Sequence, residues 1–189
     1  MAMDDTALVA LVAAGDDDAL CELTRRYRAP LRRYLWRQLD GDARAVEEAV
    51  QDVFVAVWRG AARYRGEAKV ATWLFQIARY LGLRARHNGR RHAALTPLEP
   101  EEGEEGQADW LGASCEDEVI DRLALADALR RLSDKHREVL ELVFVFGFSP
   151  DEVARILEAP VGTIKSRISY ARRALLLALR GAPAKEARS

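Results

Sequence analysis

Apolar residues recur at intervals of three and four along most of the chain, and no stretch alternates apolar and polar residues over more than a few positions. This spacing is typical of amphipathic helices and predicts an all-α protein. In the N-terminal half, helices are expected over residues 5–14, 16–39, 42–59 and 69–91. Gly15 ends the first helix, the acidic run that starts at Asp16 begins the second, and Pro30 is expected to kink it.

Two of these helices carry regular apolar stripes. The stripe of the helix at residues 42–59 consists of Val46, Val50, Val53, Phe54 and Val57. The stripe of the helix at residues 69–91 consists of Trp73, Leu74, Ile77 and Leu81. An apolar stripe of this kind is stable only when it packs against other elements. We therefore predict a small helical domain over residues 1–92.

The middle of the chain has a different composition. Residues 95–115 contain prolines, glycines and many glutamates but few apolar side chains. Such a segment buries too little apolar surface to offset the entropy of ordering it. The composition predicts an acidic, flexible linker over residues 93–116.

Apolar periodicity returns after this linker and predicts a second helical domain over residues 117–180, with a tail at 181–189. Its helices are expected over residues 117–132, 134–146, 150–157 and 161–179. The last two form a predicted helix-turn-helix. Ser149 and Glu152 have the spacing of a capping box with Pro150 at the first helical position, and Pro160 opens the next helix after a short turn.

The last helix has two chemically different sides. Its apolar line consists of Ile164, Ile168, Ala171 and Leu175. The opposite line consists of Thr163, Ser166, Arg167, Tyr170 and Arg173, with Lys165 and Arg172 on the flank. A helix of this kind can pack one side on its partner and offer the other to base edges and phosphates in the major groove. An amphipathic hairpin with a solvated basic face fits the same pattern.

Charge is distributed in blocks, although the whole chain carries a net charge of only -1. Residues 1–92 carry +4, residues 93–121 carry -10 and residues 122–189 carry +5. Two basic modules joined by an acidic segment indicate contact with nucleic acid at both ends of the chain.

Other features exclude several classes of protein. No apolar run approaches the roughly 18 residues of a membrane span, and the acidic N-terminus is unlike a secretory signal, so we expect a cytoplasmic protein without membrane insertion. Cys21 is expected to pack within its helix, Cys115 lies in the acidic segment, and the histidines are expected at the surface. There is no phosphate-binding glycine loop, HExxH pattern or nucleophile–base set. We therefore expect no enzyme activity, no cofactor and no metal site.

Several segments together resemble a known family. Residues 160–169 (PVGTIKSRIS), with residues 129–140 before them, resemble region 4 of the sigma-70 family in its extracytoplasmic-function (ECF) group. Residues 47–59 (EEAVQDVFVAVWR) resemble region 2.2 of the same family. Residues 64–68 (YRGEA) and 72–79 (TWLFQIAR) resemble regions 2.3 and 2.4. Both signatures occur in the order that the family has.

The resemblance implies an alternative sigma factor with two small helical domains. Such a protein binds core RNA polymerase and directs promoter-specific transcription initiation. Region 2 would contact the coiled coil of the beta-prime subunit and capture one strand of the −10 element. Region 4 would read the −35 element as duplex DNA and touch the beta flap. Small sigma factors of this type are commonly held by an anti-sigma factor, so that partner is expected as well.

The resemblance also assigns roles to residues of this chain. The polymerase contact is expected at Glu47, Glu48, Gln51, Asp52 and Val55. Capture of the single strand, which needs cations and stacking partners, is expected at Arg63, Tyr64, Arg65, Lys69, Trp73, Arg79 and Tyr80. Reading of the duplex is expected at Thr163, Lys165, Ser166, Arg167, Tyr170, Arg172 and Arg173. For Trp73, a place in the core is an equal alternative.

Three positions depart from the family's pattern. Tyr80 stands where Asn is common, Glu158 replaces a common Gly at the turn, and Tyr170 stands where Arg is frequent. Two other functions stay open from the residues alone. One is a stand-alone helix-turn-helix regulator that binds duplex DNA without polymerase, and the other is an inactive sigma-like helical interaction protein.

Overall fold

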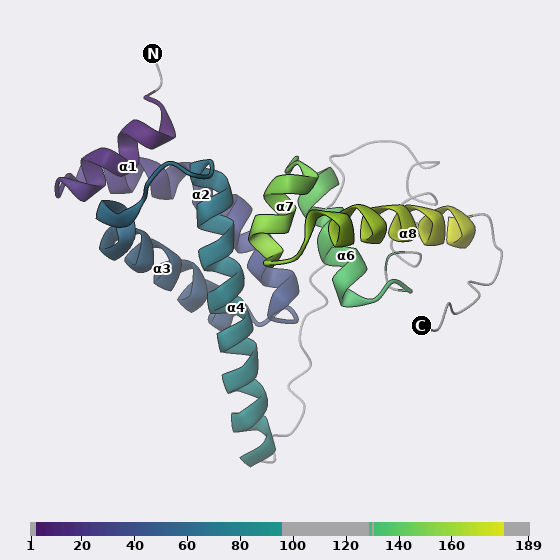
Figure 1. Ribbon diagram of the computed structural model, residues 1–189. Helices are drawn as coiled ribbons and strands as arrows, with labels where there is room; N and C mark the ends of the chain where they lie inside the picture. The colour runs from purple at the N-terminus through teal and green to yellow at the C-terminus, as the bar shows by residue number, and fades with distance from the viewer. Residues whose placement is uncertain (1–2, 96–128, 130, 180–189) are drawn as a thin grey trace, which may run out of the picture. The chain divides into compact units, whose positions relative to one another are not determined.

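The computed structural model describes residues 3–95, 129 and 131–179. The described helices form two compact units, one N-terminal and one C-terminal. The N-terminal unit consists of α1 (Asp5–Ala13), α2 (Asp17–Gln38), α3 (Ala43–Gly60), the short 3₁₀ helix η1 (Ala61–Arg63) and α4 (Val70–Leu95). The C-terminal unit consists of α6 (Asp134–Leu140), η2 (Glu141–Val145), α7 (Pro150–Leu157) and α8 (Val161–Leu179) (Figure 1). The all-α prediction is confirmed for the described part of the chain.

The predicted helices agree with the observed ones to within a few residues, with two differences. α4 continues to Leu95, so residues 93–95, which were assigned to the linker, are helical. The helix expected over residues 134–146 ends as the π-helical turn η2, in which the Phe146 amide donates to the Glu141 carbonyl at 3.1 Å. A pattern of apolar positions does not report such a local widening of a helix. The rest of the predicted linker, most of the helix expected over residues 117–132 and the tail lie outside the described residues.

Aspartates and a serine are the N-cap residues of α1, α2, α3 and α7. The side chains of Asp4, Asp16 and Asp42 accept hydrogen bonds from amides in the first turns of α1, α2 and α3. At α7 the capping box is complete: the Ser149 hydroxyl accepts from the Glu152 amide at 3.3 Å, and the Glu152 carboxylate accepts from the Ser149 amide at 2.8 Å. Each cap satisfies amides that have no partner within their own helix.

The core of the N-terminal unit lies between α2, α3 and α4, which pack against one another (Figure 1). The predicted stripe of α3 is buried over its whole length, from Val46 to Val57. From α2, Leu31 and Leu35 are fully buried, and the Tyr34 ring lies 5.2 Å from that of Phe75 on α4. α1 packs on α2 and η1. The apolar periodicity of the sequence therefore identified the buried side of α3 correctly.

α2 and α4 lie close together at Gly82. A Cβ atom at this position would lie 2.3 Å from Gln38 Oε1 and 2.9 Å from Leu35 Cδ2. Both distances are shorter than van der Waals contact. A side chain at residue 82 would therefore push the two helices apart or displace the buried Leu35 side chain.

The C-terminal unit has its own small core. α8 packs on α6 and α7, and the apolar side chains between them are buried. These are Val139, Leu142, Val153, Ile156, Ile164 and Ala171. Between α7 and α8, Glu158 adopts the left-handed conformation with φ 51° and ψ 47°. The turn therefore keeps a backbone that a glycine adopts easily.

Gly82→Ala is expected to destabilise the protein by about 1–2 kcal/mol, because overpacking of a close helix contact outweighs the gain in helix propensity. Gly89→Ala is the matched control on the same helix, since nothing lies within 4 Å of a Cβ atom there. That variant is expected to be stabilised by up to about 1 kcal/mol. Urea unfolding followed by circular dichroism measures both, and equal stability of the two variants would contradict the close contact.

Candidate nucleic-acid and partner interfaces

A shallow groove of about 460 Å³ runs between α2 and α3. Its lining is mostly apolar and consists of Asp17, Leu20, Thr24, Arg28, Val50, Gln51, Phe54, Val55 and Trp58. Of the five residues expected to contact a partner, Gln51 and Val55 line this groove, and Asp52 is exposed on the same helix. Val55 is 43% exposed. Val55 and Trp58 thus form an exposed apolar strip along α3, next to the groove.

Trp58 is the main residue of this groove that the sequence analysis missed. Its side chain is 55% exposed, which is rare for a tryptophan in a small helical unit. It lies one turn after Val55 and two turns after Gln51, so the helical spacing could have identified it. Exposed aromatic side chains at the centre of a patch are frequent anchors of protein interfaces.

Glu47 and Glu48 lie in different surroundings from the other predicted contact residues. Glu47 is half-buried and bridges α3 to α2, because Arg28 and Arg32 donate to its two oxygens at 2.9 and 2.7 Å. These two hydrogen bonds hold the pKa of Glu47 below its ordinary value. Glu48 is exposed and pairs with Arg44 at 3.0 Å on its own helix. Glu47 is therefore already engaged in a contact between α3 and α2.

The segment between η1 and α4 brings together several residues of the predicted strand-capture site. Arg63, Arg65 and Lys69 are exposed there. The Tyr64 ring is half-buried with its centroid 4.9 Å from that of Trp73, and its hydroxyl donates to the Ala68 carbonyl at 2.5 Å. Burial raises the pKa of Tyr64. The loop is thus closed around an aromatic pair and surrounded by cations.

Trp73 lies neither wholly at the surface, as strand capture would require, nor wholly in the core, which were the two alternatives from the sequence. Its side chain is half-buried, and it covers Gly60 as well as Tyr64. On the following turns of α4, Arg79 is half-buried, whereas Tyr80 is 67% exposed. Leu83, which the sequence analysis did not single out, is 46% exposed one turn further. The surface of α4 next to the loop therefore combines cations with large exposed side chains.

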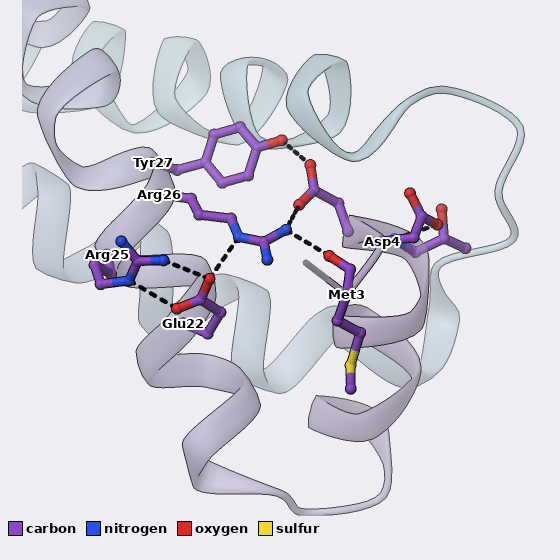
Figure 2. A network of polar contacts seen from close by, with 8 residues as sticks. Met3, Asp4, Glu22, Arg25, Arg26 and Tyr27 are labelled. Carbon is purple, nitrogen blue, oxygen red and sulfur yellow. Dashed lines mark hydrogen bonds and ion pairs between the residues drawn. The ribbon is translucent and has the colours of Figure 1, made fainter. Parts of the chain in front are cut away.

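A network of polar contacts ties α1 to α2 beside this loop (Figure 2). The Arg26 guanidinium lies at its centre and donates to Asp5 Oδ1 at 2.6 Å, to the Met3 carbonyl at 2.8 Å and to Glu22 Oε1 at 2.7 Å. The Tyr27 hydroxyl donates to the other oxygen of Asp5. Arg25 and Arg26 together lower the pKa of Glu22 to about 2. These contacts fix the start of α1 on α2.

The same end of α1 reaches the strand-capture loop. The Thr6 side chain lies near that of Tyr64 and acts to lower its pKa, and α1 packs on η1. The sequence analysis missed this arrangement, since it joins residues far apart along the chain. No periodicity or local motif reports such a contact.

The structure shows which part of α8 faces outward. Ile164 and Ala171 are fully buried, as expected, while Ile168 and Leu175 are half-buried. Thr163 and Arg167 are also half-buried. The exposed residues along the helix are Gly162, Lys165, Ser166, Ser169, Tyr170, Arg172, Arg173, Leu176 and Leu177.

The outer face of α8 is therefore centred on residues that differ somewhat from the predicted line. On a helical projection, Ser169 and Arg173 lie near its middle, with Lys165 and Arg172 on one flank and Ser166 and Tyr170 on the other. Ser169 was missed by the sequence analysis because it is small and uncharged. The Ser166 hydroxyl donates to the Thr163 carbonyl at 2.9 Å.

His136 of α6 lies against the Tyr170 side of α8. The two rings are stacked with their centroids 4.5 Å apart, and His136 Nδ1 shares a hydrogen bond of 2.8 Å with the Ser133 hydroxyl. Burial, and then the nearby charge of Arg167, lower the pKa of His136. His136 was expected at the surface and is half-buried instead. Cys21, expected to pack, is exposed.

Comparison with known proteins identifies both units. Residues 23–92 match the family model described as Sigma-70 region 2, and residues 122–175 match the one described as Sigma-70, region 4. The chain is 34% identical over 177 residues to the ECF RNA polymerase sigma factor SigL of Mycobacterium tuberculosis, covering 92% of this chain and 96% of SigL. It is 31% identical over 189 residues to the ECF RNA polymerase sigma-E factor of Escherichia coli K12, covering 92% and 93% of the two chains.

Solved structures have the same fold. The structure of CnrH in complex with the cytosolic domain of CnrY matches with a TM-score of 0.63 at 24% identity, covering 95% of this chain and 99% of CnrH. The sigma factor RpoE of Bartonella quintana, in complex with the anti-sigma factor NepR, matches with a TM-score of 0.61 at 26% identity, covering 84% and 95%.

The chain belongs to the sigma-70 family, within its ECF group. It is accordingly a sigma factor, a non-enzymatic subunit that directs transcription initiation by RNA polymerase. A stand-alone helix-turn-helix regulator would account for the match to region 4 but not for the match to region 2. Within the described residues, no helix is long and apolar enough to cross a membrane.

Proposed function

We propose that this sigma factor divides promoter recognition between its two units, with the α2–α3 groove binding core polymerase, the η1–α4 loop capturing the −10 strand and α8 reading the −35 duplex. The observation that carries this proposal is that each of these three surfaces is exposed while the opposite side of its helix is buried in a core. The protein would act in the cytoplasm, together with core polymerase and promoter DNA.

The α2–α3 groove suits a helical partner such as the coiled coil of the beta-prime subunit. An apolar floor that includes Val55 and Trp58 supplies the desolvated contact, and polar groups such as Gln51 and Arg28 lie at its edge. Helices commonly bind in grooves of this kind through a few apolar anchors with charges around them. We assign Gln51, Asp52, Val55 and Trp58 to this contact, with Glu47 and Glu48 at its border.

The Trp58→Ala and Asp52→Arg variants test this assignment. Trp58→Ala is expected to weaken binding to core polymerase by about thirtyfold, the loss typical of an aromatic anchor. Asp52→Arg is expected to weaken it as well, because it reverses a charge beside the groove without disturbing a buried contact. Fluorescence titration with labelled protein measures the affinity.

The matched control is Leu83→Ala, which truncates another exposed apolar side chain of the same unit that does not line the groove. Its affinity for core polymerase is expected to stay within about twofold of the unmodified protein, since truncating a side chain outside an interface costs little binding energy. Unchanged core affinity of Trp58→Ala, with helicity intact by circular dichroism, would remove this groove from the proposal.

The η1–α4 loop suits a single strand. Arg63, Arg65 and Lys69 supply cations for the backbone, and neighbouring Tyr80 offers an exposed ring on which a base can stack. Tyr64 and Trp73 pack against each other, so we assign them a supporting role in the shape of the loop. Thr6 of α1 lies next to Tyr64 and supports it from the other side of the loop.

Replacing Arg63 and Arg65 together with Ala is expected to impair promoter opening while core affinity and duplex docking stay normal. The reason is that these cations are exposed and would contact the strand only after it separates. Permanganate footprinting of the melted region measures opening. Arg44→Ala, which removes an exposed arginine of α3, is the control, and an equal loss of opening in that variant would argue against a specific role of the loop.

α8 suits the −35 duplex because its outer face combines small polar residues with cations. Arg173 lies near the middle of that face, and Lys165 and Arg172 lie on its flank. A central arginine can reach base edges, whereas flanking cations meet phosphates. Thr163, Ser166, Arg167 and Tyr170 complete the proposed reading surface from the side that faces α6. The beta flap would be contacted by another part of the same unit.

Arg173→Ala is expected to relax sequence preference at one or two positions of the −35 element, by about 1–3 kcal/mol of discrimination. Lys165→Ala is expected to weaken all sequences about equally and to reduce the salt dependence of binding. Both are measured with the holoenzyme on a promoter library randomised at the −35 element. Identical profiles for the two variants would show that the reading face has been placed incorrectly.

An anti-sigma factor is a further proposed partner. RpoE of Bartonella quintana, which is 26% identical in sequence to this chain, is bound to the anti-sigma factor NepR in its solved structure. The exposed apolar strip of α3 offers a surface that such a protein could cover in competition with polymerase.

An inactive sigma-like role would appear in the assays above as a holoenzyme that forms but does not initiate transcription.

A further inference from the structure

Tyr170 does not project freely from the recognition helix. Its ring is stacked on that of His136 of α6, with centroids 4.5 Å apart and planes inclined by 30°. The Tyr170 side chain is nevertheless 42% exposed, so part of it stays available on the outer face of α8. The stack therefore covers one face of the ring while part of the side chain stays exposed.

His136 is itself held in place by neighbouring groups. Its Nδ1 shares a hydrogen bond of 2.8 Å with the hydroxyl of Ser133, which is the N-cap residue of α6. Arg137, the next residue, donates to the carbonyls of Leu129 and Leu132 at 3.0 Å each and so fixes the turn before α6. His136 is thus a side chain on a fixed support and not a mobile surface group.

The charge state of His136 fits the stacking contact. Burial and the nearby Arg167 both lower its pKa, which favours the neutral ring. Two neutral rings at this distance attract each other through dispersion and quadrupole interactions. A contact of this kind favours one orientation of the Tyr170 ring before DNA arrives.

We propose that His136 is a specificity-determining positioning residue for −35 recognition, which acts by holding the Tyr170 ring at one place on the reading face of α8. The inference rests on the proposed function of α8. A ring fixed in advance loses little freedom on binding, so its contact with a base edge adds more to discrimination than that of a mobile ring. The phenol offers an apolar edge for a thymine methyl group and a hydroxyl for a base or phosphate oxygen.

The test uses the full-length protein in the holoenzyme and the promoter library randomised at the −35 element. His136→Ala is expected to reduce preference by about fivefold at the same position that Tyr170→Ala affects, the low end of what one base contact discriminates. His136→Phe keeps a ring for the stack and is expected to restore the profile. His136→Asn keeps a polar group that can reach Ser133 but has no ring, and is expected to resemble His136→Ala.

The double variant His136→Ala with Tyr170→Ala supplies a second readout. Because both changes remove one contact, its profile is expected to match that of Tyr170→Ala alone. A purely structural role of His136 would instead weaken binding to all sequences equally, and that outcome overturns the proposal. The proposal is also overturned if His136→Asn restores the −35 preference as completely as His136→Phe does. If His136→Ala fails to fold, the comparison of the Phe and Asn variants still decides.

Arg173→Ala in the same library separates this inference from the proposed function. A change of preference in Arg173→Ala with none in His136→Ala would refute the positioning role and leave α8 as the reader. No change of preference in either variant would refute the assignment of α8 itself.

Discussion

Burial of a single apolar stripe on α3 between α2 and α4 is the constraint on which the N-terminal unit depends. Val46, Val50, Val53 and Val57 are almost fully buried, and the close approach at Gly82 brings α2 and α4 together beside them. Burying this stripe fixes the rotation of α3. The flank of the helix that carries Trp58 must then face outward along α2, so the packing of the core also creates the proposed polymerase surface.

The same relation between core and surface holds in the C-terminal unit. Ile164 and Ala171 have no exposed surface, which fixes the rotation of α8 and turns Arg173 outward. The capping box at Ser149 and the left-handed Glu158 set where α7 begins and ends. A non-glycine residue in that conformation costs about 1–2 kcal/mol, a strain that the complementary packing of α7 and α8 offsets.

Ionic side chains in this protein divide into two groups with different effects. Arg26 and Glu47 bond across helices and specify how α1 and α3 sit on α2. Ion pairs that stay in contact with solvent contribute little stability each, so the main effect of these partly buried pairs is on geometry. Arg63 and Arg65 instead remain exposed around a closed loop, where their charge is available to a nucleic acid backbone. Whether an arginine supports the fold or a ligand thus depends on the acids within its reach.

The sequence alone determined the helical class, the helix boundaries to within a few residues where the structure describes them, the buried stripe of α3, the capping box and the family, because each depends on local periodicity or on motifs along the chain. Tertiary structure decided where individual side chains act. It assigned Glu47 to an internal bridge, Arg167 to the half-buried side of α8, and Tyr170 to a stack on His136. It also revealed the link from α1 to Tyr64. These facts join residues on different helices, and a helical pattern fixes the direction of a side chain on its own helix but not the neighbour that it meets.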